Sequence, residues 1–409
     1  MGRMLVKNFG PIKNSGFQWI DTRKVTVFCG TQGSGKSTVV KLISEFCWLE
    51  KALNRDEFGV KELTTYDRFK KKYCAFHNIQ NYFRPESEIR YEGEYYNFEY
   101  SDSKLTVTPA GKGIDYIRPQ IVYIPAERNL LNVLEDTERI KKLPGALSVL
   151  LTEYVNALRS LDGVENLPLS GDYSVQYDKL NKITWLRGPG FRVRVSESAS
   201  GFQSLLPVVL VSRYLQGLIV KGMNGDNLSK ESLQEVQRRD ATIKKLLDDK
   251  TLDDDTRLSL IKQLSSNTRN GRLINIVEEL EQNLYPASQR QVLYELLKIN
   301  NETEGNQLLL TTHSPYLINY LSLAVKAGNL SSKAPAEELQ ASIDAVVPHL
   351  SQVCEDQVVI YELTETGEIH PLNMLYGVPS DDNFLNAALG DSNDDFDNLM
   401  NVEDGMLCR

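Results

Sequence analysis

The fold is decided by one glycine-rich stretch, Gly30-Thr31-Gln32-Gly33-Ser34-Gly35-Lys36-Ser37. It fits the phosphate-loop pattern in full: a glycine, four residues, then Gly-Lys-Ser. The apolar run from Lys24 to Cys29 is typical of a buried strand, and apolar residues then recur at helical spacing from Ser37 to about Lys51. A strand, a glycine loop and a helix in this order favour a nucleotide site. The alternative is a glycine-rich turn without a ligand.

Each residue type in this loop has a role in holding phosphate. Glycines let successive backbone amides point at the phosphate oxygens, while Lys36 neutralises the terminal phosphates. The hydroxyl of Ser37 is of the kind that coordinates Mg²⁺ in such loops. The residues predicted to contact the nucleotide are Gly30, Gly33, Ser34, Gly35, Lys36, Ser37 and Thr38.

Two segments far downstream carry the remaining chemistry. A hydrophobic strand, Leu273 to Val277, ends in Glu278 and Glu279, which suits Mg²⁺ coordination by the first acid and water activation by the second. A solvated strand end is the alternative. His313 follows a second apolar strand and is a candidate for contact with phosphate. The alternative is that it is a structural residue, as a single histidine at a strand end usually is.

The decisive resemblance is to ABC ATPases. The run Glu278 to Pro286 resembles their Walker B motif and D-loop, in the group where Glu replaces the usual Asp, and Thr311 to Pro315 resembles the H-loop. Ser198-Ala199-Ser200-Gly201-Phe202-Gln203 resembles the signature motif before a long apolar helix. The resemblance implies that His313 contacts the γ-phosphate of ATP. It also implies that Ser200 and Gly201 reach ATP held by a second copy, in a head-to-tail ATP-sandwich dimer or a larger oligomer. We assign Gln203 to the same site.

A further segment, Tyr123 to Arg128, resembles a strand end of stand-alone ABC ATPases related to the SMC, RecF and overcoming-lysogenization-defect proteins. Arg128 there is expected to face phosphate, or alternatively to pair with Glu127 or a neighbour. The resemblance extends from Leu5 to about Phe396. It implies an α/β ABC ATPase head with a mixed central sheet, an antiparallel β subdomain and a helical lobe bearing a short helical hairpin insertion.

The implied domain organisation has four parts. Residues 1–222 form the first part of the ATPase domain, 223–270 the helical hairpin, 271–379 the second part of the ATPase domain and 380–409 an acidic tail. The signature departs from the common pattern at Ala199 and Phe202, and no glutamine is assignable to the Q-loop. These departures predict slow or partner-gated hydrolysis.

Charge and composition limit the classes of partner that the chain is expected to bind. The chain has 46 Lys and Arg against 55 Asp and Glu, a net charge of −9, and eight of the acids lie between Ser380 and Asp404. The near-neutral remainder lacks the overall charge of an obligate nucleic-acid binder. DNA remains a possible partner through Arg68-Phe69-Lys70-Lys71-Lys72-Tyr73, for which a solvated helix face is the alternative. The tail is expected to be mostly solvated, with Phe384, Leu385, Leu389 and Phe396 indicating that part of it packs.

The expected location is cytoplasmic. The sequence contains no run of about 18 apolar residues, so no membrane association is expected. Five scattered cysteines without CxxC pairing argue against disulfides or a zinc site.

The resemblance also carries an expectation about biological role. Within the stand-alone group it points to bacterial anti-phage ATPases of the PtuA and AriA kind, which implies a sensor or scaffold that holds a separate effector protein, a nuclease or a toxin. An SMC/RecF-like DNA-repair ATPase and a nucleotide-gated scaffold with negligible turnover are the alternatives.

Overall fold

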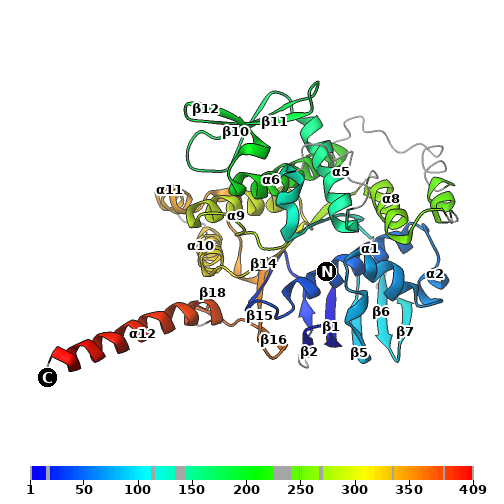
Figure 1. Ribbon diagram of the computed structural model, residues 1–409, viewed down its shortest axis with the longest axis horizontal. Helices are drawn as coiled ribbons and strands as arrows, with labels where there is room; N and C mark the ends of the chain where they lie inside the picture. The colour runs from blue at the N-terminus through cyan, green and yellow to red at the C-terminus, as the bar shows by residue number, and fades with distance from the viewer. Residues whose placement is uncertain are drawn as a thin grey trace.

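The computed structural model (Figure 1) describes residues 2–14, 19–111, 116–133, 143–223, 241–247, 249, 251–266, 270–333, 336–380 and 383–407. Its centre is a six-stranded sheet in the order β16-β15-β4-β14-β13-β8. All neighbours are parallel except β16, which is antiparallel to β15. The strands are β4 (Val25–Gly30), β8 (Pro119–Ile124), β13 (Arg272–Val277), β14 (Gln307–Thr312), β15 (Val358–Leu363) and β16 (Ile369–Pro371).

The central strands are buried on both faces. Every residue of β4, β13 and β14 is buried, as is usual for parallel strands covered on two sides. Because parallel strands end at the same edge, the carboxyl ends of these three strands bring the phosphate loop, the two acids and the His313 segment together.

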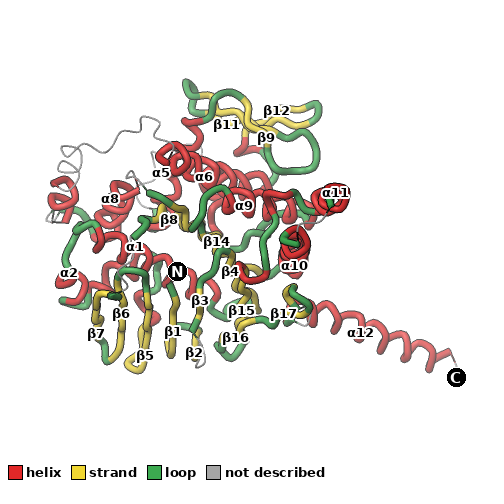
Figure 2. Tube along the Cα trace, turned by 180° about the vertical axis from the view of Figure 1, so that it is seen from behind, coloured by secondary structure: helices red, strands yellow, loops and turns green. Residues whose placement is uncertain are grey.

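One face of the central sheet is covered by α1 (Lys36–Asn54), the helix that follows the phosphate loop. An antiparallel sheet packs against the other side of α1, in the order β2-β1-β5-β6-β7 with β3 beside β1. Figure 2 shows this three-layer arrangement from behind. The strands are β1 (Arg3–Phe9), β2 (Ile12–Asn14), β3 (Ile20–Asp21), β5 (Phe83–Glu92), β6 (Tyr96–Ser101) and β7 (Lys104–Pro109).

A helical lobe covers the opposite face of the central sheet, and its buried side chains form one continuous core with that face. Its helices are α5 (Gly145–Ser160), α6 (Ser200–Met223), α9 (Pro286–Asn301), α10 (Pro315–Ser331) and α11 (Glu337–Val346). Among the described helices, α6 alone is long and apolar enough for a membrane span by length and composition, yet 72% of that window is buried in the protein. The predicted α/β class, with mixed sheet, antiparallel subdomain and helical lobe, is confirmed.

A second antiparallel sheet precedes α6, in the order β12-β11-β10-β9. Its strands are β9 (Val164–Asn166), β10 (Ser174–Asp178), β11 (Ile183–Gly188) and β12 (Phe191–Arg194). It lies at the top of Figure 1, on the lobe side of the molecule. Its last strand alone has a clear sequence signal, the alternation of apolar residues with arginines from Phe191 to Val195.

The predicted insertion is described in part. Residues 224–240 of its first arm lie outside the described residues, whereas 241–247 and α8 (Asp254–Ser266) are helical. Asp253 caps α8 by accepting hydrogen bonds from the backbone N and the hydroxyl of Thr256. Lys262 of α8 forms a buried ion pair with Glu45 of α1, at 2.8 Å. This part of the insertion is therefore attached to the helix that begins at the phosphate loop.

The acidic tail is a helix, α12 (Phe384–Leu407), which runs away from the body in Figure 1. The backbone N of Phe384 donates to Glu362 of β15 at 2.5 Å, and Leu385 packs against the helical-lobe core. Phe396, by contrast, is 62% exposed. The expectation that part of the tail packs therefore holds for its first turn, and the side chain of Leu389 lies outside the described residues.

Candidate functional site

The phosphate loop depends on glycines with positive φ. Gly30 has φ +140° and Gly35 has φ +104°, a region that L side chains rarely adopt. A Cβ on Gly30 would also lie 2.2 Å from the carbonyl oxygen of Leu363 in the neighbouring strand. Only glycine therefore allows β4 to turn into the loop while still paired with β15.

Lys36 lies inside this loop. Its Nζ donates to the carbonyl oxygens of Gly30 at 3.0 Å and Thr31 at 2.7 Å, and lies 3.5 Å from the hydroxyl of Ser34. Burial lowers the pKa of Lys36 to about 8, against the opposing effect of the nearby acids. The ammonium group is thus held at the centre of the loop by acceptors that a phosphate oxygen can replace.

Glu278 has the features of a metal ligand. It is buried immediately after β13, and its Oε2 accepts a hydrogen bond from the backbone N of Ala126 at 3.3 Å. Its Oε1 is buried and accepts no hydrogen bond of ordinary geometry from the described residues, although the Tyr123 hydroxyl faces the carboxyl group. Such an oxygen needs a partner, and a carboxylate oxygen is a hard ligand of the kind that Mg²⁺ prefers.

Glu279 and His313 meet beside the loop. Glu279 has φ +43°, and its backbone N donates to the hydroxyl of Thr311 at 3.0 Å. Its partly exposed carboxylate lies 3.9 Å from Nε2 of His313. Burial, followed by the charge of Lys36, lowers the pKa of His313, whose ring also lies against the Gly30 carbonyl. The structure therefore brings Lys36, Glu279 and a neutral His313 together at one edge of the sheet.

Glu281 is a positioning residue that the sequence did not reveal. Its carboxylate accepts hydrogen bonds from the Thr312 hydroxyl at 3.0 Å and from the backbone N of His313 at 2.5 Å. Burial raises its pKa. Its place in the D-loop run marks Glu281 as a residue near the site, but its hydrogen-bond partners lie about 30 residues later in the chain, so its role could not be inferred from the sequence. Glu281 fixes the backbone of the H-loop relative to the acids.

Arg128 does not lie where the sequence placed it. Its guanidinium is fully buried and donates to the backbone carbonyls of Glu278 at 2.6 Å, Glu279 at 2.7 Å and Ser204 at 3.0 Å, with a longer bond to Pro125 at 3.3 Å. With its donors directed at these carbonyls, it does not face a phosphate, and it forms no pair with Glu127 among the described contacts. Instead it joins the two acids to the first turn of α6.

The signature segment is built around that first turn. Ser200 is exposed at the start of α6, and a Cβ on Gly201 would lie 2.8 Å from the carbonyl oxygen of Asn283 in the D-loop. The Gln203 amide is not free for a nucleotide, because its Nε2 donates to three carbonyls of the preceding loop. Among the described contacts, no hydrogen bond or ion pair joins this turn to the phosphate loop of the same chain.

A proline interrupts the hydrogen bonding of this turn. Pro207 lies inside α6 and has no N–H to donate to the carbonyl oxygen of Gln203. The side-chain amide of Asn132 donates to that oxygen instead, at 2.7 Å, and Asn132 is held in turn by the hydroxyl of Tyr154. Side chains from another segment therefore replace a missing bond of the helix.

The basic and aromatic segment 68–73 offers no stacking platform. Phe69 and Tyr73 are buried in the core between α1 and the antiparallel sheet. Arg68 pairs with Glu62, and Lys72 is buried. The aromatic residues that suggested base stacking are core residues, so the DNA hypothesis loses its specific support.

The comparison with protein families matches one segment of the chain, the part that carries the two acids and the H-loop histidine. Residues 269–319 match the family model described as an AAA domain, putative AbiEii toxin, Type IV TA system. The matched segment contains Glu278, Glu279, Glu281 and His313. No curated protein matches the chain.

Several solved structures of SMC heads are similar to the chain at low identity. An SMC head domain from Thermotoga maritima is 12% identical with a TM-score of 0.37, covering 91% of this chain and 98% of that one. An SMC head bound to the C-winged helix domain of ScpA is 10% identical with a TM-score of 0.40, and the coverage is 91% and 97%. An Smc head with an extended coiled coil, bound to the C-terminal domain of ScpA derived from Pyrococcus furiosus, is 10% identical with a TM-score of 0.36 and the same coverage.

Proposed function

We propose that the chain is a cytoplasmic ABC-type ATPase that binds and hydrolyses ATP in a site completed by a second copy. The observation that carries this proposal is the convergence of Lys36, Glu278, Glu279 and His313 at one edge of the central sheet. The loop lysine, an unsatisfied buried carboxylate oxygen, a partly exposed acid and a neutral histidine are the groups that phosphoryl transfer to water requires.

Mg²⁺ fits this site. The Ser37 hydroxyl and Oε1 of Glu278 would hold it, since Ser37 follows Lys36 in the first turn of α1 and Oε1 accepts no hydrogen bond of ordinary geometry among the described residues. The ion supplies positive charge against the β- and γ-phosphates.

The hydrolytic step uses residues of this chain. Glu279 orients a water molecule and takes its proton as the oxygen attacks the γ-phosphorus, and the bond to the ADP oxygen breaks. His313, neutral because of burial and Lys36, donates a hydrogen bond toward the γ-phosphate. Lys36 exchanges its carbonyl partners for phosphate oxygens. Products are ADP and inorganic phosphate.

The signature residues support a dimer. Ser200 is exposed at the N-terminus of a 24-residue helix, where backbone N–H groups favour an anion. The resemblance of this turn to the ABC signature motif implies that the phosphate it would serve is bound by another copy. Ser200 and Gly201 would then close over the γ-phosphate from the side opposite Lys36.

Hydrolysis is tested by phosphate release. Glu279→Gln is expected to lower the rate by a factor of about 10²–10⁴ while ATP binding persists, because the general base is lost. Glu127→Gln, an exposed acid near the site, is the matched control and should keep the wild-type rate. Equal, near-zero rates in all three proteins would refute the enzyme and support a nucleotide-gated scaffold with negligible turnover.

Dimerisation is tested by light scattering after gel filtration. Glu279→Gln with Mg²⁺ and ATP is expected to elute as a dimer, and adding Ser200→Arg should return it to monomer with ATP still bound. Ser342→Arg, on the exposed face of α11, is the control. If Glu279→Gln stays monomeric with Mg²⁺ and ATP, the ATP-sandwich dimer is wrong.

We place this ATPase in anti-phage defence, as the sensor or scaffold for a separate nuclease or toxin. The family model that matches residues 269–319 is described as an AAA domain and a putative AbiEii toxin of a type IV TA system, which supports a role beside a second protein. Co-purification of a neighbouring-gene product in a fixed ratio would support this role. Salt-dependent duplex binding by the isolated protein, without any such partner, would favour DNA repair instead.

A further inference from the structure

The C-terminal helix α12 carries an apolar stripe that the described part of the chain leaves uncovered. Phe396 is 62% exposed, Leu399 is 68% exposed and Met406 is 71% exposed. At 100° per residue these side chains and Met400 fall on one face of the helix. Large exposed side chains gathered on one helix face mark an interaction surface, whereas single ones do not.

The same helix is strongly acidic. From residue 383 to 407 it has no Lys or Arg, and its acids are Asp391, Asp394, Asp395, Asp397, Glu403 and Asp404. Asp395 and Asp397 flank the apolar stripe, because they lie about 100° from Phe396 on either side of it around the helix axis. The surface that covers this helix must therefore offer both apolar area and positive charge.

The outer face of the β9–β12 sheet has both properties. The register places Ser174, Arg187 and Arg192 side by side across three strands, and Gln176, Trp185 and Arg194 in the next row. The intervening row, including Val175 and Leu186, points into the core. We call the surface formed by Trp185, Arg187, Arg192 and Arg194 the arginine face.

Two of the three arginines of this face, Arg187 and Arg192, present their charges to solvent. Arg187 and Arg192 are exposed, and neither takes part in an ion pair with any described residue. The guanidinium of Arg192 lies 4.0 Å above the Trp185 ring, and Arg187 donates to Gln176. Asp178, on β10 of the same sheet, accepts hydrogen bonds from Asn181 in its own turn, and these bonds, followed by a smaller effect of Arg192, lower its pKa. Because Arg192 covers the ring of Trp185, the face suits an apolar helix with acidic flanks better than stacked bases.

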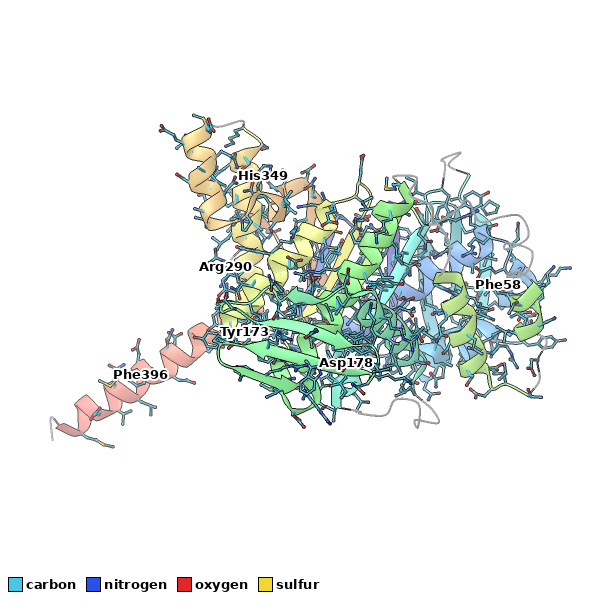
Figure 3. All side chains as sticks on the ribbon, turned by 90° about the horizontal axis from the view of Figure 1, so that it is seen from above. Phe58, Tyr173, Asp178, Arg290, His349 and Phe396 are labelled. Atoms are coloured by element: carbon cyan, nitrogen blue, oxygen red, sulfur yellow. The ribbon has the colours of Figure 1, made fainter. Side chains whose placement is uncertain are left out.

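We propose that α12 of one copy docks on the arginine face of a second copy. The apolar stripe around Phe396 would lie beside Trp185 and along the methylene groups of the arginines, and Asp395 and Asp397, one on each flank of the stripe, would pair with Arg187 and Arg192. Figure 1 and Figure 3 show that α12 projects from the body away from the sheet that carries Asp178, so the helix reaches this face on another molecule. Each copy contributes its own α12 to one neighbour and binds the α12 of another copy. Such contacts close either into a reciprocal dimer or into a ring.

The test is charge-swap complementation in full-length, nucleotide-free protein, where the ATP sandwich does not contribute. Sedimentation velocity is expected to show wild-type self-association that weakens at least tenfold between low salt and about 0.5 M salt, because exposed ion pairs are screened. Asp395→Lys/Asp397→Lys and Arg187→Glu/Arg192→Glu should each weaken association at least tenfold. Their equimolar mixture should form heterodimers, since one variant keeps a wild-type helix and the other a wild-type face.

The control is Glu337→Lys/Glu338→Lys, the same charge change on exposed residues of α11, which should associate as wild type. All substituted residues are exposed, so circular dichroism is expected to show unchanged folding. A monomeric wild type at every concentration, a mixture that fails to associate, or a helix variant that associates as wild type would each overturn the proposal. So would loss of nucleic-acid binding in Arg187→Glu/Arg192→Glu with association unchanged.

Discussion

Replacing Arg128 by Met should destabilise the protein and slow hydrolysis while leaving ATP binding intact. The guanidinium donates three short hydrogen bonds, at 2.6, 2.7 and 3.0 Å, to carbonyls of Glu278, Glu279 and Ser204. At about 1–1.5 kcal/mol for each buried bond, their loss amounts to roughly 3–4.5 kcal/mol. That is a large part of the about 5–15 kcal/mol that stabilises a typical native protein.

The assay is urea unfolding followed by tryptophan fluorescence, combined with phosphate release. Arg128→Lys should fall between wild type and Arg128→Met, since a lysine has fewer donors and no planar fork. Arg159→Met, an exposed arginine at the end of α5, is the control and should change the free energy of unfolding by no more than about 0.5 kcal/mol. A loss below about 1 kcal/mol in Arg128→Met, or an unchanged hydrolysis rate, would refute the structural role.

Three further predictions concern the helices around the site. Gly201→Ala should lower the free energy of unfolding by about 1–3 kcal/mol and weaken ATP-dependent dimerisation, because its Cβ would lie 2.8 Å from a D-loop carbonyl oxygen. Gly217→Ala in the same helix meets no atom within 4 Å and should raise the free energy of unfolding by about 0.5–1 kcal/mol. Urea titration distinguishes the two variants. Lys262→Met should cost about 3–5 kcal/mol by leaving Glu45 buried and unpaired, and the double variant with Glu45→Met should recover most of the loss in thermal melting. ATP affinity should fall as pH rises from 7 to 9.5, because the pKa of Lys36 is lowered to about 8 and the cation is lost above it; pH-independent binding of a fluorescent ATP analogue would contradict this.

The elements that hold the site were predictable because their signals are local. The phosphate loop, the strand before Glu278 and the strand before His313 are each marked by a short apolar run ending in polar residues. Parallel pairing then brings their ends to one edge, which the strand pattern implies without further information.

The contacts that position the site were not predictable. The short bonds of Arg128 go to carbonyls 76, 150 and 151 residues away, and backbone carbonyls have no sequence signature. The β9–β12 sheet was missed for a different reason. Its strands are short, and in β11 the apolar residues Trp185 and Leu186 are adjacent, so the alternation is too short and irregular to indicate strands.

The first turn of α6 has an unusual mechanical attachment. The carbonyls of Gln203 and Ser204 accept hydrogen bonds from Asn132 and Arg128, and Pro207 follows three residues after Ser204. The turn that presents Ser200 is thus attached to the strand-end segment and the acids, while one backbone hydrogen bond to the rest of its helix is missing at the proline. We expect α6 to bend most easily at Pro207, so that Ser200 moves together with the acids.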